Sequence, residues 1–209
     1  MERVTANIKL QSPFGALISG PSMSRKSTLI FNMLTNPSKI FNSTPKRIVY
    51  VYGAWQPAFE EIPEIEFISS LDKVLHEDFF DSSICNFLVL DDMMDEISNN
   101  ANASKLFTKY IHHKNISVFF LVQNLFRQGK AMRDIVLNCQ YMFLFRNARD
   151  VGQIQLLARQ LGLRHLVPAY EAAIKDPYGY LFIDLHSKTP STLKLQSNLF
   201  GLRKVYLPK

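Results

Sequence analysis

Short apolar runs recur along this sequence and are separated by longer stretches with helical spacing. The runs are rich in β-branched and aromatic residues and lie at Phe14–Ser19, Arg47–Tyr52, Ile65–Ser69, Asn86–Asp92, Ile116–Asn124, Tyr141–Arg146 and Tyr178–Leu185. Helices are expected at Lys26–Thr35, Leu71–Phe80, Ser104–His113, Met132–Asn138, Asp150–Leu161 and His165–Lys175. Continuous apolar strands are typical of a sheet covered on both sides. The alternation therefore predicts an α/β fold, with a mainly parallel sheet and helices on both faces.

The size and composition of the chain predict a single domain spanning residues 1–209. The chain is 47% apolar and 20% charged, which excludes a disordered polymer. The alternation of strands and helices stops at about residue 187. The remaining segment is interpreted either as a last strand with a basic tail or as solvated surface. Its cationic residues are Lys188, Lys194, Arg203, Lys204 and Lys209.

No apolar run approaches the roughly 20 residues that a membrane-spanning helix needs, and the N-terminal residues lack the apolar core of a secretion signal. We therefore expect an intracellular, soluble protein with no membrane partner. Cys85 and Cys139 lie beside apolar stretches and are interpreted as core thiols. The net charge of +6 is compatible with a polyanionic partner, but also with ordinary solubility.

The sequence GPSMSRKST follows the first apolar run and leads into the first expected helix. In a phosphate-binding loop, the backbone turns after a strand so that its N–H groups point at phosphates near a helix N-terminus. Lys26 would neutralise phosphate charge, and the hydroxyl of Ser27 would coordinate Mg²⁺. The candidate nucleotide-binding loop consists of Gly20, Pro21, Ser22, Met23, Ser24, Arg25, Lys26, Ser27 and Thr28.

Arg25 departs from this motif because it stands where the second glycine belongs. Glycine at that position tolerates a positive φ and a close approach to phosphate. If the backbone at Arg25 is left-handed, the arginine costs about 1–2 kcal/mol. The loop could still function, because its cradle is made of backbone N–H groups, and a guanidinium could even favour phosphate. The alternative interpretation is a chance match or a decayed nucleotide site.

Acidic and amide side chains follow two later apolar runs. The run NFLVLDD ends in Asp91 and Asp92, which have different surroundings because side chains alternate along a strand. Asp91 suits the coordination shell of Mg²⁺, and Asp92 suits the polarisation of an attacking water. Gln123, near the end of ISVFFLVQN, would orient water or sense the γ-phosphate. Asp95 and Glu96 rank below Asp91 and Asp92 by position, and each of these side chains could instead cap or bond a neighbouring loop.

The most extended sequence signals are the runs FLVLDDMMDE, HHKNISVFFLVQNLFRQGKAMRDIVLNCQYMFLFRNARD and DPYGYLFIDL. By these runs the chain resembles the poxvirus-type DNA-packaging ATPases of the FtsK/HerA superfamily, which occur in large DNA viruses and in virus-like elements such as Polintons and adintoviruses. The resemblance covers roughly residues 13–200, and the combined motifs are more specific than any one of them. It implies a P-loop NTPase fold of the RecA-like (ASCE) type, with an extra strand between the phosphate-loop strand and the carboxylate strand.

The resemblance also implies roles for individual residues. The nucleotide loop of the family falls on Gly20–Thr28, its magnesium and catalytic carboxylates on Asp91 and Asp92, and its strand-end glutamine on Gln123. The implied ligands are ATP and Mg²⁺. The family forms rings in which an arginine of one subunit reaches the nucleotide of its neighbour. The candidates for that arginine, among which the sequence does not choose, are Arg133, Arg146 and Arg149.

The function implied by the resemblance is an ATP-driven motor that translocates double-stranded DNA into a preformed capsid. Its partners would be DNA, further copies of the chain in a hexamer or pentamer, and a capsid or portal-vertex protein at the site of virion assembly. DNA contacts would be electrostatic and independent of base sequence, with pore-loop candidates at residues 93–104 and 126–133. A nucleotide-binding but hydrolysis-defective homologue is the alternative that Arg25 supports. A small-molecule phosphotransferase fits less well, because the sequence has no apparent arginine-rich lid.

Overall fold

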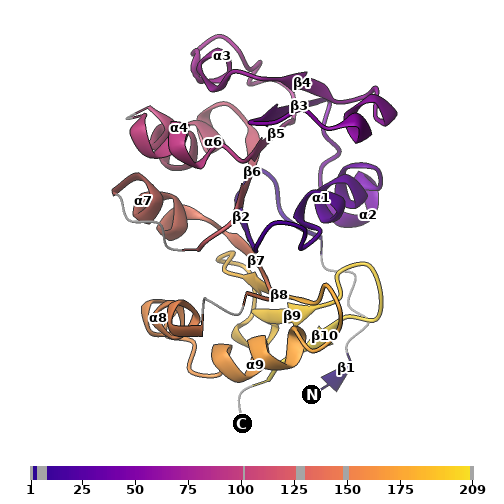
Figure 1. The fold of residues 1–209 in the computed structure, drawn as a ribbon, viewed down its shortest axis with the longest axis vertical. Helices are drawn as coiled ribbons and strands as arrows, with labels where there is room; N and C mark the ends of the chain where they lie inside the picture. The colour runs from indigo at the N-terminus through magenta and orange to yellow at the C-terminus, as the bar shows by residue number, and fades with distance from the viewer. Residues whose placement is uncertain (1, 4–8, 101, 126–129, 148–150, 208–209) are drawn as a thin grey trace.

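The computed structural model describes residues 2–3, 9–100, 102–125, 130–147 and 151–207. A ten-stranded sheet runs through these residues in the order β1-β10-β9-β8-β7-β2-β6-β5-β3-β4 (Figure 1). The strands are β1 (Glu2–Arg3), β2 (Gly15–Ser19), β3 (Arg47–Tyr52), β4 (Glu66–Ile68), β5 (Asn86–Asp91), β6 (Ile116–Val122), β7 (Tyr141–Phe145), β8 (Tyr180–Asp184), β9 (Leu195–Ser197) and β10 (Lys204–Val205).

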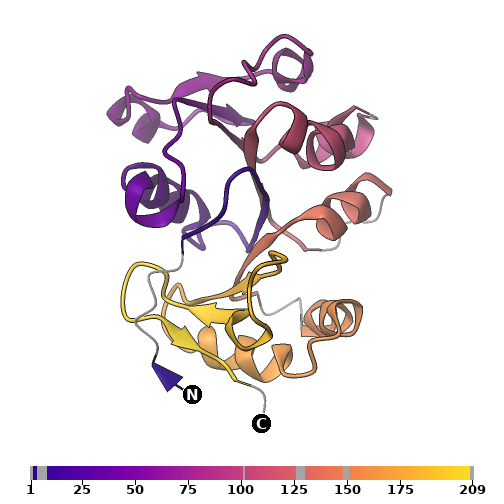
Figure 2. The ribbon, with the colours of Figure 1, turned by 180° about the vertical axis from the view of Figure 1, so that it is seen from behind.

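Helices cover both faces of this sheet, as the sequence pattern predicts. They are α1 (Lys26–Leu34), α2 (Pro37–Ile40), α3 (Leu71–Leu75), α4 (Met94–Asn99), α5 (Ala103–Lys105), α6 (Ile111–His113), α7 (Lys130–Asn138), α8 (Val151–Leu161) and α9 (Leu166–Ala173), with short 3₁₀ or π segments η1 (Pro57–Glu61), η2 (Leu106–Tyr110) and η3 (Ser191–Leu193). Figures 1 and 2 show α1 and α2 on one face and α4, α6, α7 and α8 on the other. Within the described ranges, no helix combines the length and apolarity needed to cross a bilayer.

The strands from β7 to β4 are parallel, and their order positions the candidate site. The phosphate-loop strand β2 pairs with β6 on one side and with β7 on the other. The carboxylate strand β5 pairs with β6 and with β3. Strand β6 therefore lies between β2 and β5, and the predicted extra strand is present. Because all these strands run in one direction, their carboxyl ends meet at one edge of the sheet.

Side chains of the central strands alternate between two hydrophobic clusters, one on each face of the sheet. Along β2, Leu17 belongs to the cluster that includes residues of α4, α7, α8 and α9, whereas Ala16 and Ile18 belong to the cluster that includes α1 and α2. This double burial explains why the strands are apolar at every position. Cys139 is buried and Cys85 is half-buried, and both are free thiols packed in or against these clusters.

The C-terminal strands form an antiparallel extension of the sheet. Strand β8 pairs antiparallel with β7, and β9, β10 and β1 continue in the same manner. The basic segment after residue 187 thus contributes strands β9 and β10 to the sheet. Its interpretation as solvated surface is wrong for Arg203, which is buried and donates a hydrogen bond from Nη1 to Gln196 Oε1 at 3.4 Å.

Helix α3 and the pore-loop candidates differ from the sequence pattern. Helix α3 ends at Leu75 rather than at Phe80. The reason is a contact with Arg47, whose Nη1 donates a hydrogen bond to the Phe79 carbonyl at 2.6 Å. The guanidinium of Arg47 also lies over the rings of Phe79 and Phe80. This tertiary contact outweighs the helical spacing. The pore-loop candidate 93–104 contains helix α4 and part of α5. In the other candidate, residues 126–129 lie outside the described ranges and the remainder is the first turn of α7.

Candidate nucleotide site

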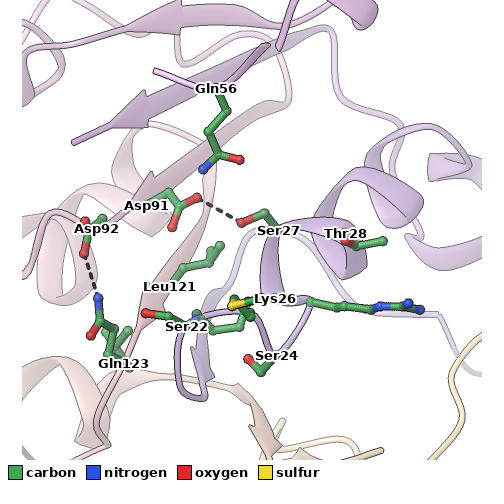
Figure 3. Close-up of a pocket in the computed structure, with 13 residues that line it drawn as sticks. Ser22, Ser24, Lys26, Ser27, Thr28, Gln56, Asp91, Asp92, Leu121 and Gln123 are labelled. Carbon is green, nitrogen blue, oxygen red and sulfur yellow. Dashed lines mark hydrogen bonds between the residues drawn. The ribbon is translucent and has the colours of Figure 1, made fainter. Parts of the chain in front are cut away.

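A pocket of about 420 Å³ lies at the carboxyl edge of the parallel strands. Its volume is in the range of small-molecule sites, and this edge is where α/β folds bind ligands. Figure 3 shows the phosphate-loop candidate facing the ends of β5 and β6 across the pocket. The described lining residues are Ser22, Met23, Ser24, Arg25, Lys26, Ser27, Thr28, Gln56, Asp91, Asp92, Leu121, Val122 and Gln123.

The phosphate-loop candidate has the backbone of an anion-binding turn. It connects the end of β2 at Ser19 to the start of α1 at Lys26, and both Met23 and Arg25 have positive φ, 65° and 70°. Left-handed residues within such a turn direct backbone N–H groups inward, toward phosphate at the N-terminus of the helix. A Cβ on Gly20 would lie 2.7 Å from Ser24 Oγ, so this position has no room for a side chain.

Arg25 meets the condition under which it costs stability, because its backbone is left-handed. Its side chain is exposed and stacks on Tyr178, with the guanidinium carbon 3.7 Å from the ring centroid. Tyr178 lies in the turn between α9 and β8, far along the chain from the loop. The sequence gives no sign of this contact, since nothing in the motif refers to the C-terminal strands.

Lys26 lies where a phosphate-binding lysine is expected. Its Nζ donates hydrogen bonds to the carbonyls of Gly20 at 2.7 Å and Pro21 at 3.0 Å, within the loop itself. Burial lowers the pKa of Lys26, while the negative charges of Asp91 and Asp92 partly oppose that shift. A phosphate in the loop would place further negative charge next to this partly buried ammonium.

Hydrogen bonds to Asp91 connect the phosphate loop to the carboxylate strand β5. Ser27 Oγ donates to Asp91 Oδ2 at 3.1 Å, and the hydroxyl of Tyr50 donates to the same oxygen at 2.5 Å (Figure 3 draws the serine contact). Tyr50 is fully buried on β3, and burial, followed by the charge of Asp91, raises its pKa, so that it remains a donor. Sequence reasoning missed Tyr50. Only the register reveals it, because Tyr50 pairs with Val89, two residues before Asp91 on the same face of β5.

Asp92 and Gln123 meet at the other side of the pocket. Gln123 Nε2 donates to Asp92 Oδ1 at 3.3 Å, and Asp92 has a φ of 58° at the end of β5 (Figure 3). Aspartate tolerates this left-handed backbone better than most residues. A Cβ on Gly53 would lie 2.8 Å from the Asp92 carbonyl oxygen, so the segment after β3 packs tightly on the acidic pair. That segment also supplies Gln56, a lining residue that the sequence did not indicate.

Of the other predicted site residues, those that the structure describes do not line the pocket. Arg133 on α7 and Arg146 after β7 are exposed and do not line it. Arg149 falls outside the described residues. Asp95 and Glu96 are exposed in the first turn of α4 and also do not line the pocket.

The residues brought together fit a nucleotide with Mg²⁺. Mg²⁺ prefers oxygen ligands, and Ser27 and Asp91 present a hydroxyl and a carboxylate next to the loop. The hydroxyl oxygen of Ser24 is buried in the loop and has no hydrogen-bond partner among the described residues. An orphaned polar atom of this kind is satisfied when a polar ligand enters.

No protein-family model and no curated protein matches the sequence. Among solved structures, the genome packaging NTPase B204 of Sulfolobus turreted icosahedral virus 2, in complex with AMPPCP, is similar with a TM-score of 0.58 and 12% identity. The match covers 95% of this chain and 100% of B204. The same NTPase in complex with sulfate has a TM-score of 0.59 at 10% identity, covering 94% and 96% of the two chains.

The cytoplasmic domain of the type VII secretion ATPase EccC from Thermomonospora curvata is similar with a TM-score of 0.56 and 13% identity, over 84% of this chain and 24% of that one. At identities this low, the structural similarity shows a shared fold and no more. The strand order, with β6 between the phosphate-loop and carboxylate strands, is the one that the sequence resemblance implies. The chain therefore has the P-loop NTPase fold found in a viral genome-packaging NTPase and in EccC, and the fold predicted from the sequence is confirmed.

Proposed function

We propose that this chain is a genome-packaging ATPase, which binds ATP with Mg²⁺ and couples hydrolysis to the movement of double-stranded DNA into a preformed capsid. The observation that carries the proposal is the 3.1 Å hydrogen bond from Ser27 to Asp91. In P-loop NTPases, residues at these two positions hold Mg²⁺ between them. The packaging role is supported by the similarity to B204, whose structures with AMPPCP and ATP-gammaS make ATP the proposed nucleotide.

Each site residue has a proposed part in hydrolysis. Lys26 releases the carbonyls of Gly20 and Pro21 and binds phosphate oxygens. Ser27 and Asp91 would hold Mg²⁺, which would supply positive charge to neutralise the phosphates. Asp92 accepts a hydrogen bond from the attacking water, and the 3.3 Å contact from Gln123 orients its carboxylate.

The proposed assembly is a ring of identical chains, a hexamer or pentamer, around DNA and docked on a capsid or portal-vertex protein. Among the described lining residues, Arg25 and Lys26 are the only cations, and Arg25 is stacked on Tyr178. As the family resemblance implies, the arginine that stabilises transition-state charge is proposed to come from a neighbouring chain. Exposed Arg133 and Arg146 remain candidates for that role, together with Arg149, and such an arginine is worth about 10³–10⁵ in rate.

The test is ATP hydrolysis by the purified chain, with and without long double-stranded DNA. We expect turnover that DNA stimulates. Lys26→Ala should lose both ATP binding and turnover. Asp92→Asn should keep ATP binding but lose about 10²–10⁴-fold in turnover, because the base is removed while the left-handed backbone suits asparagine. Turnover that is insensitive to DNA would contradict a translocating motor.

A hydrolysis-defective homologue is the second candidate, favoured by the left-handed backbone of Arg25. This candidate predicts that calorimetry detects ATP binding to the chain, whereas its rate of ATP hydrolysis is no higher than that of the Lys26→Ala variant. In that case Arg25→Gly distinguishes the origin of the defect. Recovery of turnover in this variant would assign the defect to Arg25 alone, whereas no recovery would locate it elsewhere in the site.

A further inference from the structure

Two residues with left-handed backbones meet through their side chains beside the nucleotide pocket. Arg25 has a φ of 70° and Tyr178 a φ of 57°. The guanidinium carbon of Arg25 lies 3.7 Å from the centroid of the Tyr178 ring, which is close for a cation–π contact. Positive φ is uncommon and costs free energy for non-glycine residues, so surrounding contacts are needed to favour it. The contact therefore joins two backbone positions that each need support.

The turn that presents Tyr178 is fixed on several sides. The N–H of Gly179 donates to the Asp176 carbonyl at 2.9 Å, and a Cβ on Gly179 would lie 2.3 Å from the Ala173 carbonyl oxygen. Next along the chain, the Tyr180 hydroxyl accepts a hydrogen bond from the backbone N–H of Leu199 at 3.1 Å. The ring of Tyr178 is thus carried by a turn packed against the end of α9 and tied to the segment after β9.

We propose that Tyr178 is a positioning residue of the nucleotide site. Its ring keeps the Arg25 guanidinium outside the phosphate cradle and stabilises the left-handed backbone that glycine adopts freely in other phosphate loops. This step rests on the proposed function in one respect, namely that the cradle binds a nucleotide. It would explain how the loop accepts arginine in place of glycine.

The magnitudes are compatible with partial compensation. At a non-glycine residue, the left-handed conformation is about five- to thirtyfold less populated than it would be at glycine. A cation–π contact at an exposed site favours it by about two- to fivefold. The Tyr178 side chain is 52% exposed, so the lower range applies. Loss of the ring should therefore weaken the loop measurably without abolishing it.

The experiment is a double-mutant cycle in the full chain, with MgATP affinity measured by calorimetry. In the chain that retains Arg25, Tyr178→Ala should lower the affinity about two- to fivefold, whereas Tyr178→Phe should preserve it because the ring is kept. In the Arg25→Gly chain, Tyr178→Ala should have no effect, since glycine needs no support. Arg25→Ala should resemble Tyr178→Ala, and combining the two should add little.

The proposal would be overturned if Tyr178→Ala lowered the affinity equally in the chain with Arg25 and in the Arg25→Gly chain. Tyr178 would then contact the nucleotide directly. The absence of any effect would overturn it as well. Urea unfolding of the same variants without nucleotide separates this proposal from the proposed function. If no variant binds ATP but Tyr178→Ala destabilises only the chain with Arg25, the backbone support stands and the ATPase function falls.

Discussion

At the scale of residues, Tyr50 is the clearest test of how the carboxylate site is held. Its hydroxyl donates to Asp91 Oδ2 at 2.5 Å from a fully buried position. Tyr50→Phe removes this bond and keeps the ring, so we expect a loss of about 1.5–3 kcal/mol in the free energy of unfolding, the range for hydrogen bonds to charged groups. Urea titration measures it. In an Asp91→Asn background the cost should fall by at least half, and an unchanged cost would refute the pairing.

The lowered pKa of Lys26 leads to a prediction of how nucleotide affinity depends on pH. Burial lowers its pKa below the usual 10.5, so the free protein loses this proton at a lower pH than an exposed lysine does. Phosphates favour the charged form. ATP affinity should therefore be constant near neutral pH and decrease as the pH rises through the lowered pKa. In the same window the ATP-free protein should gain stability with pH, because the unfolded chain still binds the proton.

Calorimetric titrations from neutral pH up to 10.5 would measure this dependence. Lys26→Arg is the matched control, because arginine keeps its charge over the whole range. Its affinity for ATP should change less with pH, whatever its absolute value. Equal slopes for the two proteins would show that another group titrates in this window.

At the scale of elements, two glycines predict opposite effects of the same substitution. Gly179 closes the turn from α9 to β8, where a Cβ would lie 2.3 Å from the Ala173 carbonyl oxygen. Gly152 lies in the first turn of α8 with nothing within 4 Å of its Cβ position. Gly179→Ala should destabilise the protein, by an amount above the usual range of about 0.5 kcal/mol for surface changes. Gly152→Ala should stabilise it by up to about 1 kcal/mol. Thermal unfolding of both variants tests the pair, and a destabilised Gly152→Ala would contradict it.

The elements that can be predicted from the sequence are those whose own residues specify the secondary structure, without help from distant pairing partners. Strands β2, β5 and β6 are buried on both faces, so their apolar runs are continuous and easily recognised. The sequence pattern predicts a loop where helix α4 lies, because this short run has no clear apolar period. The strands β9 and β10 are too short for a pattern and depend on pairing with distant residues.

The same distinction applies to the site. Lys26, Ser27, Asp91, Asp92 and Gln123 can be predicted because each lies at a fixed distance from a motif or at the end of a strand. The structure brings them to one pocket, and their roles stay predictions. The missed residues act across elements and are recognised only once pairing and packing are known. They are Tyr50 on β3, Gln56 after it, and Tyr178 in the turn before β8.

At the scale of the whole molecule, the sheet divides into two parts with different tasks. The parallel strands bring the loop, the carboxylates and Gln123 to one edge, while the antiparallel strands carry Tyr178 to the outer side of the loop. The extension therefore contacts the nucleotide site directly. A shift of the antiparallel strands would therefore move Tyr178 relative to Arg25. In the proposed ring, this contact would couple the C-terminal strands to the bound ATP.

The overall charge of +6 leads to the last prediction, which concerns DNA. A motor that grips the phosphate backbone releases counterions on binding, so its affinity for duplex DNA should fall with salt, with a log–log slope of about −0.9 per phosphate neutralised. Affinity should be equal for duplexes of the same length and different sequence, since backbone contacts carry no base information. Fluorescence anisotropy over a salt series measures both properties, with circular dichroism as the control that the fold is unchanged. A shallow slope, or a strong preference for one sequence, would contradict a translocating grip and favour a chain that binds nucleotide without moving DNA.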